Sequence, residues 1–311
     1  MSMFTVKEVA TSKGVLQYRT ERLTGISCRI SPDRLQRNLD QTRPLADNGK
    51  DCPFCRENIF SVTPTFSDGT RHTRGESVTF PNLYPFSKKH VVTVITRDHT
   101  VEEFGVGQIV DAFHGQIEAL RDSEGYASIN WNYLPSAGAS LIHPHMQGLS
   151  DCQPSQIVRK YIYAHDRYRR DCGRNYWNDV KEQEQASERY LFGEEIVWSA
   201  HAVPVGEREV RGILPVSTLC EIEPYIDLLA EGIHEILAMY RKLGTKAFNM
   251  SVFFDNPGTD RRISGFCSLI SRINPNEKST SDSAFMERLH LEPVIMTLPE
   301  DLGKFYKKEK N

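Results

Sequence analysis

A short run, HPHMQ, places three chemically capable side chains at alternate positions. His143, His145 and Gln147 would share one face of an extended strand, because side chains in a strand alternate between faces. Two imidazoles and an amide in one row are unusual in a core, since each buried ring nitrogen needs a hydrogen-bond partner. A neutral imidazole is a good nucleophile near neutral pH, and its adduct with phosphorus is a reactive phosphoramidate. The row therefore predicts a catalytic strand that acts at phosphorus.

The loop before this strand, NYLPSAGASLI from Asn132 to Ile142, supports the same chemistry. Gly138 allows the backbone to approach a ligand closely, and Ser136 and Ser140 add hydroxyls near backbone amide donors. A phosphate needs several convergent hydrogen bonds of this kind. The loop and the strand together predict a phosphate-binding site beside the histidine row.

Seven cysteines, an odd number in a long chain, argue against a framework of disulfide bonds. Cys52 and Cys55 form CPFC, and this spacing indicates either half of a metal site or a redox pair. Two thiolates with two imidazoles would form a closed tetrahedral set that favours a structural zinc. The isolated cysteines are predicted to be small buried hydrophobic residues, namely Cys28, Cys152, Cys172, Cys220 and Cys267.

Composition and charge narrow the class of protein. With 39% hydrophobic, 10% aromatic and 25% charged residues, the 311-residue chain is predicted to be globular. Its formal net charge of −3 offers no overall attraction to nucleic acid or to an anionic membrane. No stretch approaches the roughly 20 apolar residues that span a bilayer, and the start shows no secretory signal. We therefore expect a cytoplasmic protein without nucleic-acid or membrane partners.

Two stretches of the chain share one order of elements, which is strand, helix, strand and strand. The first runs through HVVTVIT, a helix, ASINWNY and SLIHPHMQGL, and the second through EVRGILPV, a helix, AFNMSVFF and GFCSLISRI. Apolar residues at helical spacing mark the two helices, namely Ile109, Phe113, Ile117 and Leu120, and then Ile226, Leu229, Ile233, Leu237 and Tyr240. The pattern predicts an α+β fold built from two repeats.

The two repeats differ at the candidate catalytic row. A rough alignment matches His143–His145 with Gly265–Cys267, so one half keeps the chemistry and the other is predicted to be structural. We expect a catalytic half with the metal site at 1–152, a solvated helical connector at 153–195 and a degenerate second half at 196–311. The end of the chain from Leu302 is predicted to be a short helix.

The pattern N-x-x-x-S-x-G-x-S-x-x-H-P-H-x-Q, from Asn132 to Gln147, resembles the active-site strand of the galactose-1-phosphate uridylyltransferase branch of the histidine-triad superfamily. Further similar segments are LTGISCRISPDRLQR with Arg34 and Arg37, CPFC, PNLYP with Asn82, and ITRDHTVEEF with His99. The similarity covers about residue 18 to 305. It implies two histidine-triad-like repeats that form one mostly antiparallel sheet with helices packed on it.

The resemblance implies a role for each matching position. His145 would be the nucleophile of a double displacement, with Gln147 beside it. A structural zinc would be held by Cys52, Cys55, His99 and His143. The residues that would bind the substrate are Arg34, Arg37, Asn82, Asn132, Ser136, Gly138, Ser140 and Phe285.

Two departures from the family pattern restrict what the resemblance implies. Members that carry a second metal use histidines in the second repeat, where this chain has GFCSLI, so a second metal is doubtful. The segment STSDSAFMERLHLEPV departs from the sugar-contacting loop of the family beyond Phe285, which leaves the hexose open.

The implied function is transfer of a uridylyl group from a UDP-sugar to a sugar 1-phosphate, through a covalent nucleotidyl-histidine, in a homodimer. One alternative is a phosphorylase, in which inorganic phosphate attacks the adduct and the substrate is an ADP-sugar or a dinucleoside polyphosphate. A hydrolase is disfavoured, because Gln147 stands where hydrolytic branches carry a third histidine. The alternative of another class is a zinc-stabilised nucleotide-binding module without activity. Neither the base nor the sugar is fixed by the sequence.

Overall fold

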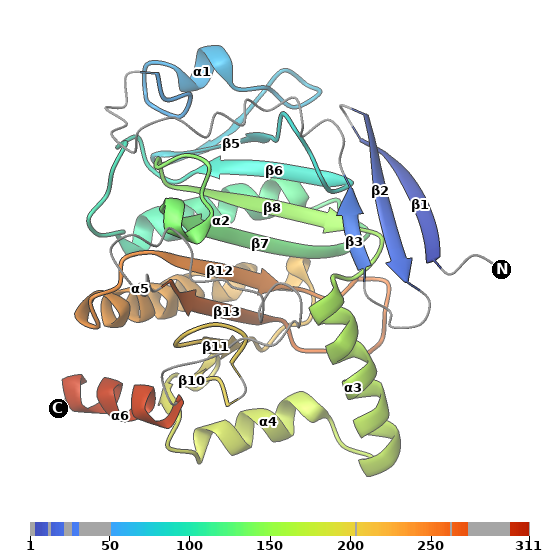
Figure 1. Ribbon diagram of the computed structural model, residues 1–311, viewed down its shortest axis with the longest axis vertical. Helices are drawn as coiled ribbons and strands as arrows, with labels where there is room; N and C mark the ends of the chain where they lie inside the picture. The colour runs from blue at the N-terminus through green and yellow to red at the C-terminus, as the bar shows by residue number, and fades with distance from the viewer. Residues whose placement is uncertain are drawn as a thin grey trace.

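A ten-stranded antiparallel sheet organises the part of the chain that the computed structural model describes, residues 4–11, 14–21, 27–30, 51–202, 204–261, 263–272 and 299–310 (Figure 1). The strand order is β4-β5-β6-β8-β7-β12-β13-β11-β10-β9. The strands are His72–Arg74 (β4), Ser77–Pro81 (β5), Lys89–Val94 (β6), Tyr126–Tyr133 (β7), His145–Asp151 (β8), Tyr190–Phe192 (β9), Val197–Ala200 (β10), Val210–Ile213 (β11), Phe248–Phe253 (β12) and Phe266–Ser271 (β13). Each neighbouring pair is antiparallel.

The strand order is symmetric about the central pair β7 and β12. Outward from β7 the strands are β8, β6, β5 and β4, and outward from β12 they are β13, β11, β10 and β9. In each half a long helix joins the strand equivalent to β6 with the central strand. The predicted α+β fold of two repeats in one sheet is therefore confirmed, and pairing of β7 with β12 joins the two halves.

The helices α2 (Val106–Leu120) and α5 (Ile226–Lys242) pack against each other and against one face of the sheet, the far face in Figure 1. All the residues predicted to line them are at most 5% exposed. Every second residue of β7 is buried against this layer, in the alternation expected of a strand with one core face. The row predicted on β8 therefore lies on a sheet whose other face is packed against two helices.

Two helices of the predicted connector, α3 (Gln156–Cys172) and α4 (Tyr176–Gln185), cover part of the second half. The helical prediction is confirmed, but the pair is not simply solvated. Phe266 of β13 stacks on Trp177 of α4 with ring centroids 5.5 Å apart, and Tyr161 of α3 meets the same ring edge-on. The sheet face of the second half that is equivalent to the candidate catalytic face is therefore filled by aromatic side chains.

The predicted match between His145 and Cys267 is wrong by one residue. Cys267 is completely buried in the core on the α5 side, and this burial raises the pKa of its thiol well above the usual value. The side chain on the opposite face is Phe266, which contacts α3 and α4. Because a shift of one residue moves a strand side chain to the other face, Phe266 is the residue that occupies the place of His145.

The prediction for the isolated cysteines is confirmed only for Cys267. Cys152, Cys172 and Cys220 are exposed, while the side chain of Cys28 lies outside the described part of the structure. The exposed three lie just after β8, at the end of α3 and in a short 3-10 turn, where the backbone leaves the core. The prediction used only the residue type, which does not show whether a position at the end of an element or in a turn faces the core or the solvent.

The remaining elements lie at the edges of the molecule. A separate three-stranded sheet contains Phe4–Thr11 (β1), Gly14–Glu21 (β2) and Ser27–Ile30 (β3), and one turn of helix, Ile59–Val62 (α1), follows CPFC. The predicted terminal helix is confirmed as Pro299–Lys310 (α6), which buries Leu302 and Tyr306 against the second half.

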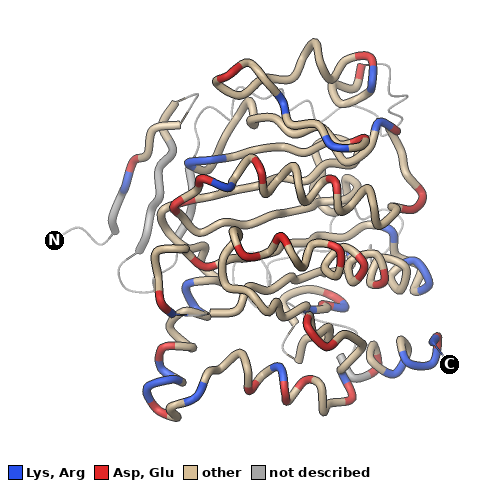
Figure 2. The backbone as a smooth tube through the Cα atoms, turned by 180° about the vertical axis from the view of Figure 1, so that it is seen from behind, with Lys and Arg blue, Asp and Glu red and all other residues tan. Residues whose placement is uncertain are grey.

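Charged residues are spread over the described chain, with acidic and basic positions interspersed when the molecule is seen from behind (Figure 2). This distribution agrees with the small net charge of −3. Of the helices in the described ranges, none is long and apolar enough to cross a bilayer.

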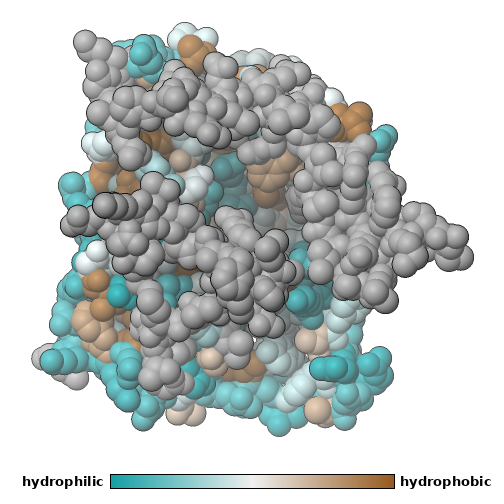
Figure 3. Space-filling view, in the orientation of Figure 1, coloured by the Kyte–Doolittle hydropathy of each residue, from teal (hydrophilic) through white to brown (hydrophobic). Residues whose placement is uncertain are grey.

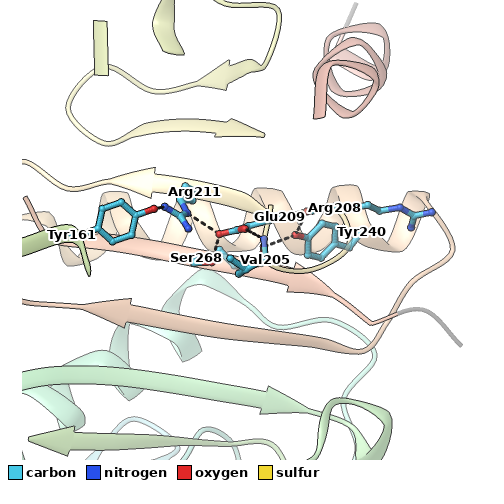
Figure 4. A network of polar contacts seen from close by, with 8 residues as sticks. Tyr161, Val205, Arg208, Glu209, Arg211, Tyr240 and Ser268 are labelled. Atoms are coloured by element: carbon cyan, nitrogen blue, oxygen red, sulfur yellow. Dashed lines mark hydrogen bonds and ion pairs between the residues drawn. The ribbon is translucent and has the colours of Figure 1, made fainter. Parts of the chain in front are cut away.

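A buried polar network fixes α3 to the second half of the sheet (Figure 4). Arg211 Nε donates to Glu209 Oε1 at 2.7 Å, and the two side chains are 7% and 0% exposed. Ser268 Oγ and the backbone amide of Val205 donate to the same carboxylate at 2.8 and 2.6 Å. The Arg211 guanidinium also donates to the hydroxyl of Tyr161 on α3. A buried ion pair persists only when its hydrogen bonds are satisfied, as they are here.

We expect Gly148→Ala to destabilise the first half of the sheet. An added Cβ on β8 would lie 2.9 Å from Leu120 Cδ1 and Val91 Cγ2, and closer still to Gln116 Oε1. Overpacking of this kind costs about 1–3 kcal/mol of unfolding free energy, to be measured by denaturant titration. Gly107→Ala on α2, where an added Cβ meets nothing within 4 Å, is the control and should be neutral or slightly stabilising. Equal stability of the two variants would contradict the packing of β8 on α2.

The buried network also predicts a pH dependence of stability. Burial, followed by the nearby positive charge of Arg211, lowers the pKa of His201 from 6.5 to about 4. Below pH 6.5 the unfolded chain binds a proton that the folded protein does not bind until about pH 4, so unfolding free energy falls with pH through this window. After allowance for partial exposure, the loss between pH 7 and pH 5 is about 1–2 kcal/mol. His201→Gln should remove this part of the slope while leaving the slope above pH 7 unchanged.

Candidate active site

The predicted row spans the start of β8. His143 and Pro144 precede the strand, and His145 is its first residue. His143 is 0% and His145 6% exposed, and the ring of Phe54 meets both imidazoles edge-on, at centroid distances of 6.1 and 5.2 Å. Both rings lie on the face of the sheet opposite α2, whereas Met146, between His145 and Gln147, faces the core on the α2 side.

One hydrogen bond sets the protonation pattern of His145. Its Nδ1 lies 2.8 Å from the backbone carbonyl oxygen of His143. A carbonyl only accepts, so Nδ1 carries the proton and donates. In the neutral ring the lone pair is then on Nε2, which is the tautomer that a nucleophilic histidine needs.

His145 lines a cavity of about 370 Å³. Five of the residues predicted to act on or bind the substrate line it too, namely Asn82, Asn132, Gly138, Ser140 and Gln147. The rest of the lining is mostly apolar and includes Phe54, Phe80, Leu83 and Val92. Figure 3 shows this face of the molecule hollowed in its upper part, where hydrophilic and hydrophobic atoms lie side by side.

Four of the residues predicted to bind the substrate are not among the described residues that line this cavity. Ser136 lies in the 3-10 turn Pro135–Ala137, half-buried and outside the cavity lining. Arg34, Arg37 and Phe285 lie outside the described residues.

The turn before β8 has an unusual backbone. Leu134 has φ of 70°, which is strained for a side chain with a Cβ, and Gly138 has φ of 82°, which glycine adopts without strain. The carbonyl of Leu134 accepts hydrogen bonds from the amides of Ala137 and Ala139, at 3.0 and 3.3 Å. Strained residues of this kind persist where surrounding contacts fix them, and they cluster at functional sites.

His90 on β6 is a site residue that sequence analysis missed. It is 5% exposed, and its Nε2 lies 2.9 Å from Gln147 Oε1 and 3.0 Å from Asn82 Nδ2. One imidazole nitrogen therefore lies close to two of the side chains predicted to act on or bind the substrate. A lone histidine in the apolar run HVVTV carries no distinctive signal.

The four predicted metal ligands come together. One ligand atom from each of Cys52, Cys55, His99 and His143 lies within 4.8 Å of every other. Cys55 Sγ is 3.4 Å from His99 Nδ1 and 3.7 Å from His143 Nδ1, and Cys52 Sγ is also 3.7 Å from His143 Nδ1. Sulfur and nitrogen ligands of one tetrahedral ion lie roughly 3.5 Å apart. The cluster therefore suits a metal ion. Because the imidazoles of His99 and His143 lie beside the two thiols, CPFC is better interpreted as half of a metal site than as a redox pair.

The tautomer and the protonation state of His143 both suit a metal ligand. Its Nε2 lies 2.8 Å from the carbonyl oxygen of Thr96, so Nε2 carries the proton and Nδ1 faces the thiols. Burial lowers the pKa of His143, which favours the neutral form that binds metal. His143 thus directs its imidazole to the cluster and its backbone carbonyl to His145.

Comparison with known proteins supports the predicted fold. No protein-family model matches the chain. An uncharacterized protein from Archaeoglobus fulgidus is 28% identical over 300 residues, covering 93% of this chain and 88% of that protein.

Solved structures of other proteins share this fold over almost the whole chain. A uridylyltransferase structure superposes with a TM-score of 0.74 at 20% identity, covering 94% of this chain and 97% of that one. An ADP-glucose phosphorylase from Arabidopsis thaliana with bound ADP-glucose gives 0.69 at 16% identity, covering 94% and 99%. A GalT-like protein from the same plant gives 0.69 at 16%, covering 83% and 92%. The predicted resemblance is confirmed at the level of the fold.

We expect Cys52→Ser to remove the metal and to lower stability more than it lowers the activity of the protein that remains folded. Loss of a ligand that closes the cluster should reduce the melting temperature by roughly 5–10 °C. Elemental analysis of the purified chain gives the metal content, and calorimetry gives the melting temperature. Cys220→Ser, at an exposed cysteine outside the cluster, is the control. A normal melting curve after complete metal removal would count against a structural role.

Proposed function

We propose that the protein is a nucleotidyltransferase in which His145 carries the nucleotidyl group. The observation that supports this most is the hydrogen bond from His145 Nδ1 to the His143 carbonyl, in a ring that lines a cavity. This bond leaves the nucleophilic lone pair on Nε2.

The reaction would proceed in two displacements. His145 Nε2 attacks the α-phosphorus of a nucleoside diphosphate sugar, a P–N bond forms, and the P–O bond to the sugar 1-phosphate breaks. A phosphate oxygen of the acceptor then attacks the same phosphorus, and the P–N bond breaks. The electron pair of each broken bond stays with the leaving group, so His145 returns to its neutral form.

The groups around the cavity would stabilise the charge that moves during these steps. Asn132, Gln147 and the loop at Gly138 and Ser140 line the cavity beside His145. Amide donors held by the fold can bind phosphate oxygens without reorganising as the reaction proceeds. Arg34 and Arg37 remain candidates for the same task on the basis of the sequence resemblance alone.

The favoured substrate pair is a UDP-sugar and a sugar 1-phosphate, as in a hexose-1-phosphate uridylyltransferase. The fold similarity to a uridylyltransferase supports this choice. A nucleotide-sugar phosphorylase is the second candidate, because the fold is also similar to an ADP-glucose phosphorylase over 94% of the chain. In that reaction inorganic phosphate would be the acceptor. The homodimer, the cytoplasmic location and the domain boundaries stay predictions.

We also propose that the ion of the cluster is a structural zinc. Two thiolates and two imidazoles fill a tetrahedral set without an open position, so the ion would hold CPFC against the catalytic strand and take no part in bond breaking. The residues of the cluster fit this ion, since their ligand atoms lie at tetrahedral spacing and His143 presents its unprotonated nitrogen.

The test is covalent labelling. Incubation with UDP-glucose or ADP-glucose labelled at the α-phosphate should leave acid-labile, base-stable label on the wild-type protein, because a phosphoramidate hydrolyses in acid. His145→Gly should carry no label, while His114→Gln, on α2 and outside the cavity lining, should label normally. Melting curves of the two variants test whether both are folded.

The labelled protein then separates the two reactions. Release of label by a sugar 1-phosphate but not by inorganic phosphate supports the transferase, and release by inorganic phosphate supports the phosphorylase. A wild-type protein that binds the nucleotide sugar but never becomes labelled would exclude both and favour a binding module.

A further inference from the structure

The second half of the sheet supplies a side chain that acts on the candidate active site. Asn249 of β12 lies directly opposite Asn132 of β7 in the strand pairing that joins the two halves. Its Nδ2 donates to Asn132 Oδ1 at 2.6 Å and to the carbonyl of Ala137 at 2.8 Å. Asn132 lines the cavity, and Ala137 ends the turn before Gly138.

The orientation of the Asn249 amide follows from its neighbours. Arg272, just after β13, donates from Nη1 to Asn249 Oδ1 at 2.8 Å. A guanidinium can only donate and a backbone carbonyl can only accept, so Arg272 and Ala137 together fix which end of the amide is oxygen. The NH₂ group of Asn249 must therefore face Asn132 and the turn.

The same chain of contacts fixes the amide of Asn132. Its Oδ1 accepts from Asn249, so its NH₂ group is the end left to point elsewhere. Phosphate oxygens only accept hydrogen bonds, and a donor is therefore the useful end for a nucleotide. The bond to Ala137 also ties the strained turn at Leu134 to the second half of the sheet.

We propose that Asn249 is a positioning residue, which turns the Asn132 amide so that it donates to the phosphates of the nucleotide and holds the turn that carries Gly138. This inference rests on the proposed function. It assigns to the second half, expected to be only structural, a direct part in preparing the site. Arg272 acts one step further away, because it fixes the polarity of Asn249.

The adjacent cross-strand pair provides a matched control. Ser251 of β12 lies opposite Asn130 of β7, and its Oγ donates to Asn130 Oδ1 at 2.8 Å. The two pairs share strands and sheet face, and in each a side chain of β12 donates to an asparagine Oδ1 on β7. Asn130 lines a different cavity and does not reach the one that contains His145.

The test compares Asn249→Asp with Ser251→Ala. Aspartate keeps the size of asparagine and the contact to Arg272 but has no donor. It should turn the Asn132 NH₂ group toward itself and leave the Asn132 oxygen facing the phosphates. Affinity for UMP and AMP, measured by calorimetry, should fall about 10- to 100-fold, and the labelling rate should fall by a similar factor. Ser251→Ala should change the affinity and the labelling rate by less than about 2-fold. The two substitutions should lower the melting temperature by similar amounts.

A double-mutant cycle distinguishes positioning from general damage. In an Asn132→Ala background, Asn249→Asp should lose most of its effect on nucleotide affinity, because the side chain through which it acts is absent. Full additivity of the two substitutions, or wild-type affinity of the folded Asn249→Asp protein, would overturn the inference.

Failure of the proposed function has a different signature. If the wild-type protein binds UMP or AMP but never becomes labelled, the transferase proposal falls while the Asn249 effect on affinity is still measured. If labelling occurs and Asn249→Asp labels at the wild-type rate, the inference falls alone. If the wild-type protein binds neither nucleotide, both are wrong.

Discussion

The hydrogen bond between His145 Nδ1 and the carbonyl of His143 is the contact on which the candidate site depends. His143 also directs its ring at Cys52 and Cys55, while its other nitrogen donates to Thr96. One residue therefore couples the cluster to the ring that is proposed to react. An ion in the cluster would fix the backbone of His143 and, through its carbonyl, both the tautomer and the direction of His145. A site built in this way can be structural at one end and reactive at the other.

The two halves share a topology but differ in what covers the sheet. In the first half the face opposite α2 contains the cavity, and in the second half the equivalent face is packed with Phe266, Trp177 and Tyr161. The ion pair of Arg211 and Glu209 fixes α3 there, at the cost of removing two charges from water. The two repeats of one fold therefore differ in this face, which forms a cavity in the first half and packs against the connector in the second.

The junction of the halves has a polar function of its own. Asn132 and Asn249 face each other across β7 and β12, with Ser251 and Asn130 beside them, so a row of amides and hydroxyls crosses the centre of the sheet. These partly buried groups form hydrogen bonds with one another. Their mutual orientation also determines which atoms face the cavity. This orientation depends on a hydrogen bond between Asn132 and Asn249, which are 117 positions apart in the chain.

The sequence by itself determined the features that depend on local spacing. Alternation placed His145 and Gln147 on one face, helical periodicity identified α2 and α5, and CPFC marked half of the cluster. Tertiary structure decided the features that depend on partners distant in the chain. It placed Phe266 rather than Cys267 in the position equivalent to His145. It also brought His90 close to Gln147 and Asn82, and Asn249 into contact with Asn132. The physical reason is that periodicity within a strand fixes which residues share a face, whereas register between strands fixes which residues touch, and register is set by pairing across the whole sheet.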